Sequence, residues 1–191
     1  MLQRIQTIYY ALAVICLLVL TLGLDVYTFT GDVSDSFELT AHYNTYGVQV
    51  NGTSSENLAP EKLEALTKYL NKEEGSILTS YSTSTVSFPF YILSILFLLL
   101  TLGAMLSFKN YKRQIRLGRM AFFFTLLALI TTVVMFYLSG SNLEALVGEE
   151  GMTKNIGFAF YALVLSVAFI FLGNIGVRRD QKLISSLDRL R

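Results

Sequence analysis

The segment FPFYILSILFLLLTLGAMLSF, residues 88–108, contains no charged side chain. A helix needs about 20 consecutive apolar residues to cross the hydrocarbon core of a bilayer, which is roughly 30 Å thick. A surface helix of a water-soluble protein would show one polar face, and this segment shows none. Because a single segment in lipid satisfies its backbone hydrogen bonds only as a helix, we expect residues 88–108 to form a transmembrane helix.

Three further segments of the same kind lie at residues 5–24, 120–138 and 156–177. The chain of 191 residues is 53% hydrophobic and only 15% charged, whereas soluble domains have about 25% charged residues. The first segment lacks a small-x-small cleavage pattern, so we expect it to remain as an uncleaved anchor. The predicted fold class is membrane all-α: a four-helix transmembrane bundle formed by a single domain over residues 1–191.

The charged residues separate into two groups along the chain. Residues 1–4, 109–119 and 178–191 contain 11 Lys and Arg but only two Asp. Residues 25–87 and 139–155 contain four Lys and 12 Asp and Glu. Because Lys and Arg are enriched in the cytoplasmic segments of membrane proteins, we expect both termini to be cytoplasmic and the two acidic segments to lie on the outer side.

The first outer segment, residues 25–87, is long enough for a small α+β subdomain. Apolar and polar residues alternate over residues 37–44 and again over residues 46–50, a pattern typical of strands. Asn51-Gly52 is a candidate hairpin turn. Leucines at helical spacing follow a proline in residues 60–70, which predicts a short helix. We expect two or three strands and one helix, with residues 75–87 as an extended return or a final strand.

The inner segments carry the basic residues. We expect residues 109–119 to form a basic turn, which serves either as a topology signal alone or also as a contact for anionic lipid or a partner. In residues 178–191, apolar residues share one helical face among basic ones, which predicts an amphipathic helix at the membrane surface or docked on a partner. The candidate contacts for a partner or for lipid are Arg4, Lys112, Arg113, Arg116, Leu183, Leu187, Asp188 and Arg189.

Several classes of function are disfavoured by the residues that the chain lacks. The four apolar segments contain no Asp, Glu, Lys, Arg or His, although coupled transporters and proton relays usually need such residues inside the membrane. One Cys and one His are too few for a disulfide framework, a Cys/His zinc site, an iron–sulfur cluster or a bis-histidine haem. The net charge of +1 gives no electrostatic reason to expect nucleic-acid binding. We therefore expect no enzyme activity and assign no catalytic, metal-binding or cofactor-binding residue.

Both ends of the chain carry distinctive sequences. The opening Gln3-Arg4-Ile5-Gln6-Thr7 and the ending Ser186-Leu187-Asp188-Arg189-Leu190-Arg191, combined with four spans over this length, resemble a domain-of-unknown-function family of small four-span inner-membrane proteins from Bacteroidota. The resemblance covers the whole chain and implies no activity. It implies a Gram-negative inner membrane, and so a periplasmic location for residues 25–87 and 139–155.

Three functional hypotheses follow. The first is a non-catalytic accessory, scaffold or assembly subunit of a larger inner-membrane complex, which would contact membrane lipids and either other membrane proteins or a second copy of the chain. An alternative is a lipid- or small-ligand-binding protein with a pocket between the bundle and the periplasmic loop. A second alternative is a membrane enzyme that uses loop carboxylates. Stoichiometric partners would favour the first hypothesis, and bound lipid the second.

Overall fold

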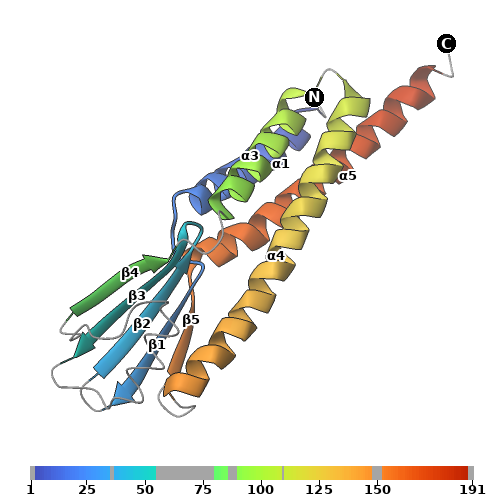
Figure 1. The fold of residues 1–191 in the computed structure, drawn as a ribbon. Coiled ribbons are helices and arrows are strands. Elements are labelled where there is room, and N and C mark those ends of the chain that lie inside the picture. The colour runs from blue at the N-terminus through green and yellow to red at the C-terminus, as the bar shows by residue number, and fades with distance from the viewer. Residues whose placement is uncertain are drawn as a thin grey trace. The chain divides into compact units, whose positions relative to one another are not determined.

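The computed structural model describes residues 3–34, 37–54, 80–85, 90–108, 110–147 and 152–188. Within these ranges the chain forms four helices and five strands (Figure 1). In chain order they are α1 (Gln3–Thr21), β1 (Tyr27–Ser34), β2 (Phe37–Asn44), β3 (Gly47–Ser54), β4 (Ser80–Thr85), α3 (Phe90–Leu106), α4 (Tyr111–Val147), β5 (Met152–Ile156) and α5 (Phe158–Asp188).

The chain divides into two compact units. We call residues 1–23, 91–131 and 161–191 the helical unit. We call residues 24–90 and 132–160 the sheet unit. Helices α4 and α5 each contribute residues to both.

The expectation of four apolar helices is confirmed. Two of them are long and apolar enough to cross a membrane, namely Tyr111–Gly140 within α4 and Phe158–Leu183 within α5. The other two form shorter apolar helices, Ile5–Thr21 and Phe90–Leu106. The tail that we expected to be helical continues α5 without a break as far as Asp188.

Each helix of the helical unit buries one narrow stripe of residues. The buried positions recur every three or four residues, so they lie on a single face. Most of them are small or carry a hydroxyl or amide group, which lets helices approach closely. The stripe consists of Gln6, Tyr10, Ala13, Leu17 and Leu20 in α1; Ser94, Phe97, Thr101 and Ala104 in α3; Gln114, Gly118, Ala121, Thr125 and Ala128 in α4; and Leu163, Ser166, Ile170, Gly173, Val177 and Asp180 in α5.

The buried hydroxyl groups find partners within their own helices. Thr101 and Thr125 each donate to the carbonyl oxygen four residues earlier, at 2.8 Å, and Ser166 donates to the one three residues earlier, at 2.7 Å. A buried hydroxyl without a hydrogen bond would cost free energy. These short side chains therefore line the interior without leaving a donor unsatisfied.

The sheet unit contains a five-stranded antiparallel sheet of order β4-β3-β2-β1-β5 (Figure 1). The strands expected at residues 37–44 and 46–50 are confirmed as β2 and β3, and the return at residues 75–87 contains the final strand β4. The sequence did not predict β1 or β5. The helix expected at residues 60–70 lies outside the described residues.

Two local expectations were wrong. The hairpin turn lies at Asn44–Gly47 and not at Asn51-Gly52, which belongs to β3. The Asn44 side chain fixes this turn by accepting hydrogen bonds from the backbone of Tyr46 and Gly47, both at 3.0 Å, and Gly47 has a positive φ of 148°. The basic segment 109–119 is mostly helix, because α4 already begins at Tyr111.

The start of α4 is explained by its cap. The side-chain oxygen of Asn110 accepts a hydrogen bond from the backbone of Arg113 at 3.3 Å. Asn is a preferred residue at this position because it satisfies a free amide of the first turn. The connection between α3 and α4 is therefore short, and the basic side chains of residues 112–119 lie on a helix.

An aromatic cluster fills the space between the sheet and the end of α4 that belongs to the sheet unit. The rings of Tyr27 and Tyr43 stack at 4.6 Å between centroids. Phe136 of α4 stacks on Phe29 at 5.4 Å and meets Tyr27 edge-on at the same distance. Such ring pairs add stabilisation beyond their buried area. The face of the sheet that bears Tyr27, Phe29 and Tyr43 is thus the core of this unit.

The link from β5 to α5 leaves no room for a side chain at Gly157. The backbone amide of Gly157 donates to the carbonyl of Val26 at 2.9 Å, and Ala159 donates to that of Asp25 at 3.2 Å. A Cβ atom at Gly157 would collide with the backbone carbonyl of Asp25. This contact explains why glycine stands where β1 and α5 approach each other.

We predict that Gly157→Ala destabilises the sheet unit by about 1–3 kcal/mol, the usual cost of overpacking a tight site. Thermal unfolding of the purified chain in detergent, followed by near-ultraviolet circular dichroism of the aromatic cluster, measures this. Gly140→Ala is the matched control, because a Cβ there meets its nearest atom at an ordinary 3.5 Å. An equal loss in both variants would contradict the argument.

Candidate functional site

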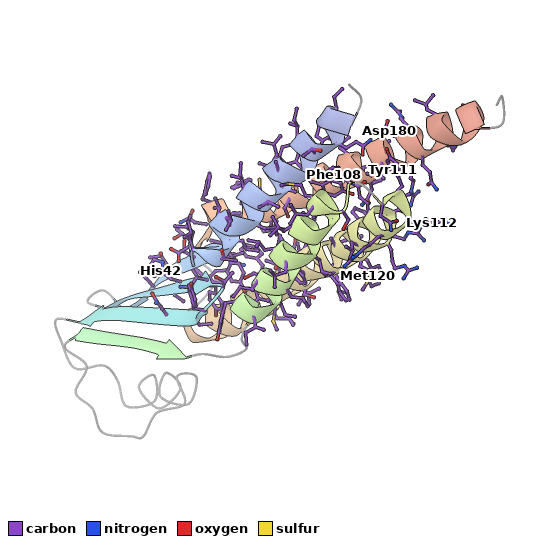
Figure 2. The ribbon with its side chains drawn as sticks, turned by 90° about the horizontal axis from the view of Figure 1, so that it is seen from above. His42, Phe108, Tyr111, Lys112, Met120 and Asp180 are labelled. Atoms are coloured by element: carbon purple, nitrogen blue, oxygen red, sulfur yellow. The ribbon has the colours of Figure 1, made fainter. Side chains whose placement is uncertain are left out.

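A groove of about 650 Å³ runs along one face of α4 in the helical unit. Its α4 residues recur at intervals of three or four, so they share one side of the helix. Gln181 of α5 completes the lining. Figure 2 labels Lys112 and Met120 at two levels of this face. The lining residues are Lys112, Ile115, Arg116, Arg119, Met120, Phe123, Phe124 and Gln181.

The groove has a basic half and an apolar half. Three cations, Lys112, Arg116 and Arg119, lie in the first three turns of α4, and all three are exposed. Apolar side chains follow, including Met120 and Phe123, of which Phe123 is 63% exposed. Among the described residues none of these three cations forms an ion pair with a carboxylate. A site of this kind suits an amphipathic ligand with a negative end.

A line of hydrogen bonds crosses the helical unit beside this groove. The Tyr10 hydroxyl of α1 donates to the side-chain oxygen of Asn174 at 3.0 Å, and the Asn174 amide donates to the carbonyl of Gly118 in α4 at 2.9 Å. The Tyr10 ring lies over Gly173, where a Cβ atom would come within 3.1 Å of it. Glycines at positions 118 and 173 thus make room for the polar link between α1, α4 and α5.

Two buried polar groups lie on the same stripes. Gln6 is 4% exposed and Asp180 is 6% exposed. Within the part of the chain that the structure describes, Gln6 Nε2 and Asp180 Oδ2 have no hydrogen-bond partner. Figure 2 shows Asp180 at the same end of the helical unit as Tyr111, the first residue of α4. The carboxylate of Asp180 is therefore in the interior of the helical unit and does not line the groove.

The structure brings together only some of the predicted contact residues. Lys112 and Arg116 line the groove, whereas Arg113 is exposed but lies outside its lining. Leu183 is 50% exposed on α5. Arg4, Leu187 and Asp188 are helical by position, and Arg189 lies outside the described residues.

A small apolar pocket of about 190 Å³ lies in the sheet unit. Tyr27 and Phe136 contribute to it, together with Val133, Tyr137 and Phe160. Burial raises the pKa of Tyr27 to about 12, and the hydrogen bond with the Ser139 side chain only partly opposes this. Tyr27 therefore stays neutral at physiological pH and serves as part of the core.

The opposite face of the sheet carries polar residues along four of its strands. Paired residues of an antiparallel ladder place their side chains on the same face. Thr28 pairs with His42 and with Asn155, and Thr30 pairs with Thr40 and with Thr153. Gln49 extends the first row, since it pairs with His42. We call Thr28, Thr30, Thr40, His42, Gln49, Thr153 and Asn155 the polar face.

His42 is held by a carboxylate next to this face. Its Nδ1 atom lies 2.9 Å from Oδ2 of Asp25, and both side chains are partly exposed. The contact orients the imidazole ring. Among the described residues no group of three or more His, Cys, Asp or Glu is placed to hold a metal ion.

The sequence profile of the family described as domain of unknown function DUF4293 matches residues 2–190. The chain belongs to this family. A comparison with curated proteins gave no match.

The geometry of this DUF4293 member adds residues that the sequence did not single out. The groove is also lined by Arg119, Met120, Phe123 and Gln181. In the sequence, Arg119 stood at the end of the predicted basic turn, and Met120 and Phe123 belonged to an apolar segment with no feature that marked a site. A helix beginning at residue 111 would have placed them on one face at intervals of three or four. The polar link through Asn174 was also missed, because a single amide in an apolar segment carries no periodic signal.

We predict that Tyr10→Phe lowers the stability of the helical unit by about 1 kcal/mol, since it removes one hydrogen bond and keeps the ring over Gly173. Asn174→Leu should cost about 2 kcal/mol, because it removes both bonds. Thermal melting in detergent checks the order. If Tyr10→Phe cost as much as Asn174→Leu, the bond to Gly118 would have no separate contribution.

Proposed function

We propose that the protein is a non-catalytic, multi-pass protein of the bacterial inner membrane that acts as an accessory, scaffold or assembly subunit of a larger membrane complex. In this proposal the four apolar helices form a transmembrane bundle. Both termini face the cytoplasm, and the sheet unit lies in the periplasm.

The distribution of side chains in the helical unit supports the membrane location. Its buried stripes are rich in small and hydroxyl-bearing residues, as in packed transmembrane helices. Its exposed faces carry large apolar side chains, for example Ile15, Leu99, Leu127 and Leu165. A water-soluble protein rarely exposes such continuous apolar surface, so lipid is the solvent that suits these helices.

The charges of the two units support the orientation. The helical unit contains 11 Lys and Arg and two Asp, whereas the sheet unit contains four Lys and 12 Asp and Glu. The division into two units therefore coincides with the division of charged residues. The positive-inside rule would assign these two sets of residues to opposite sides of a membrane.

The observation that carries the scaffold function is the polar face. It extends over β5, β1, β2 and β3. One side of the sheet packs on aromatic rings, and the other carries hydroxyl, amide and imidazole groups at these positions. Such groups make many directional hydrogen bonds at little desolvation cost compared with charges. A protein surface of complementary polarity is therefore a suitable partner.

The other two hypotheses have unequal support. The groove on α4 and the small pocket in the sheet unit favour a lipid- or small-ligand-binding role as the second candidate. For a membrane enzyme that uses loop carboxylates, the described residues contain no group of three or more His, Cys, Asp or Glu that could hold a metal ion.

For topology, we predict that a periplasm-active reporter enzyme is active when fused after Asn57 and inactive when fused after Arg113 or Arg191. The reason is the charge separation between the two sides. Reporter activity in living cells measures this, with a cytoplasm-active reporter at the same three sites as the control. The reverse pattern would overturn the orientation.

For partner binding, we predict that Thr40→Lys with Gln49→Lys lowers recovery of copurifying membrane proteins about tenfold, because two unpaired charges would have to be desolvated in the interface. The measurement is affinity purification of the full tagged chain from membranes in mild detergent, with quantitative mass spectrometry. The variant should keep the melting temperature of the wild type, since both side chains are outside the aromatic core.

Thr40→Ser with Gln49→Asn is the matched control, and it should recover partners at the wild-type level because the hydrogen-bonding groups remain. Deletion from Leu183 onward tests the cytoplasmic tail as the rival contact. If that deletion abolishes recovery and the lysine variant does not, docking occurs through the tail and the polar face has no part in it. If no protein copurifies at stoichiometric level with the wild type, the scaffold function is wrong.

A further inference from the structure

We infer that the groove on α4 binds one anionic phospholipid of the cytoplasmic leaflet. Lys112, Arg116 and Arg119 hold its phosphate, and an acyl chain lies along Met120 and Phe123. This inference rests on the membrane placement proposed above, but it does not depend on the scaffold role.

The spacing along the helix fits the two halves of a lipid. With a rise of 1.5 Å per residue, the three cations extend over about 10 Å of α4, and Phe124 lies about 7 Å beyond Arg119. A polar headgroup and the upper part of an acyl chain follow each other at this scale. The groove volume of about 650 Å³ is within the range of small-molecule sites, roughly 300–1,000 Å³.

The charges of the surrounding residues favour an anion. The helical unit has 11 Lys and Arg against two Asp. One of these acids, Asp180, is buried, while its neighbour Gln181 lines the groove. Among the described residues, no Asp or Glu lines the groove. Two guanidinium groups one helical turn apart can both donate hydrogen bonds to one phosphate, and each can do so through two N–H groups.

The apolar half decides between a lipid and an acidic peptide. Phe123 lies on the same exposed side of α4 as Leu127 and Ile130, both about half exposed. These residues belong to the stretch long enough to cross a membrane. A peptide would have to enter the hydrocarbon region with its backbone hydrogen bonds unsatisfied, whereas a phospholipid already has its chains there. The occupant that matches both halves is a phospholipid.

The test measures lipid retention by the full chain purified in detergent. Native mass spectrometry counts bound phosphatidylglycerol and phosphatidylcholine after equal loading. We expect the wild type to retain phosphatidylglycerol in preference to phosphatidylcholine. Arg116→Gln with Arg119→Gln should lower that preference roughly thirtyfold, given the usual contribution of each basic residue at an anionic surface. Inorganic phosphate at millimolar concentration should not displace the lipid, because it lacks the acyl chain.

Arg178→Gln with Arg179→Gln is the matched control. It removes the same charge from two exposed residues of the helical unit that do not line the groove, and it should keep the wild-type preference. Equal loss in both variants, or no preference in the wild type, would overturn the site. Binding of a soluble poly-glutamate peptide that depends on Arg116 and Arg119 while lipid retention does not would also overturn it, and would assign the groove to an acidic segment.

Two further measurements distinguish loss of lipid binding from loss of folding. Circular dichroism and melting show whether the double variant is folded, and Lys112→Gln with Arg116→Gln replaces it if it is not. The assay uses the purified chain alone, so a failure of lipid binding leaves partner recovery from membranes unaffected. A failure of partner recovery likewise leaves this site standing.

Discussion

The hydrogen-bonded link from Tyr10 through Asn174 to Gly118 is the interaction on which the arrangement of the helical unit depends. Apolar helices in an apolar solvent gain little from hydrophobic burial against one another, so close packing and internal hydrogen bonds must hold them together. The link through Asn174 provides both close packing and hydrogen bonds. Glycine at 118 and 173 allows the approach, and the amide joins three helices that are distant in sequence.

The need for close packing and internal hydrogen bonds also explains the composition of this unit, which has polar residues in its interior and apolar residues on its surface. Its buried stripes carry Ser, Thr, Gln and even Asp beside apolar residues such as Leu17 and Ile170, while many other large apolar side chains face outward. The sheet unit follows the opposite rule, with aromatic rings inside and threonines, glutamine and asparagine on its other face. With the helical unit in lipid, as proposed above, one chain would contain two units built for two solvents. The positions of charged residues agree with this division.

The sequence predicted the four helices because long uncharged segments leave few alternatives, and it predicted β2 because alternation over residues 37–44 is clear. It failed for β5, since MTKNI at residues 152–156 does not alternate and gains its place only by pairing with β1. It also misplaced the hairpin, because Asn51-Gly52 has the typical turn composition but Asn44 supplies the actual cap. For the groove, the basic residues were recognised and the aromatic half was not, since their common face depends on where α4 begins.

Strand β1 joins two parts of the chain that are synthesised far apart in time. It pairs with β2 on one side and with β5 on the other, and residue 156, the end of β5, follows residue 34, the end of β1, by 122 residues. At a synthesis rate of about 5–20 residues per second, the open side of β1 waits roughly 6–24 seconds for its partner. An unpaired strand of this length is a template for pairing with other chains. The sheet therefore passes through an incomplete state during biogenesis, and its completion reports that helices α3 and α4 have been made.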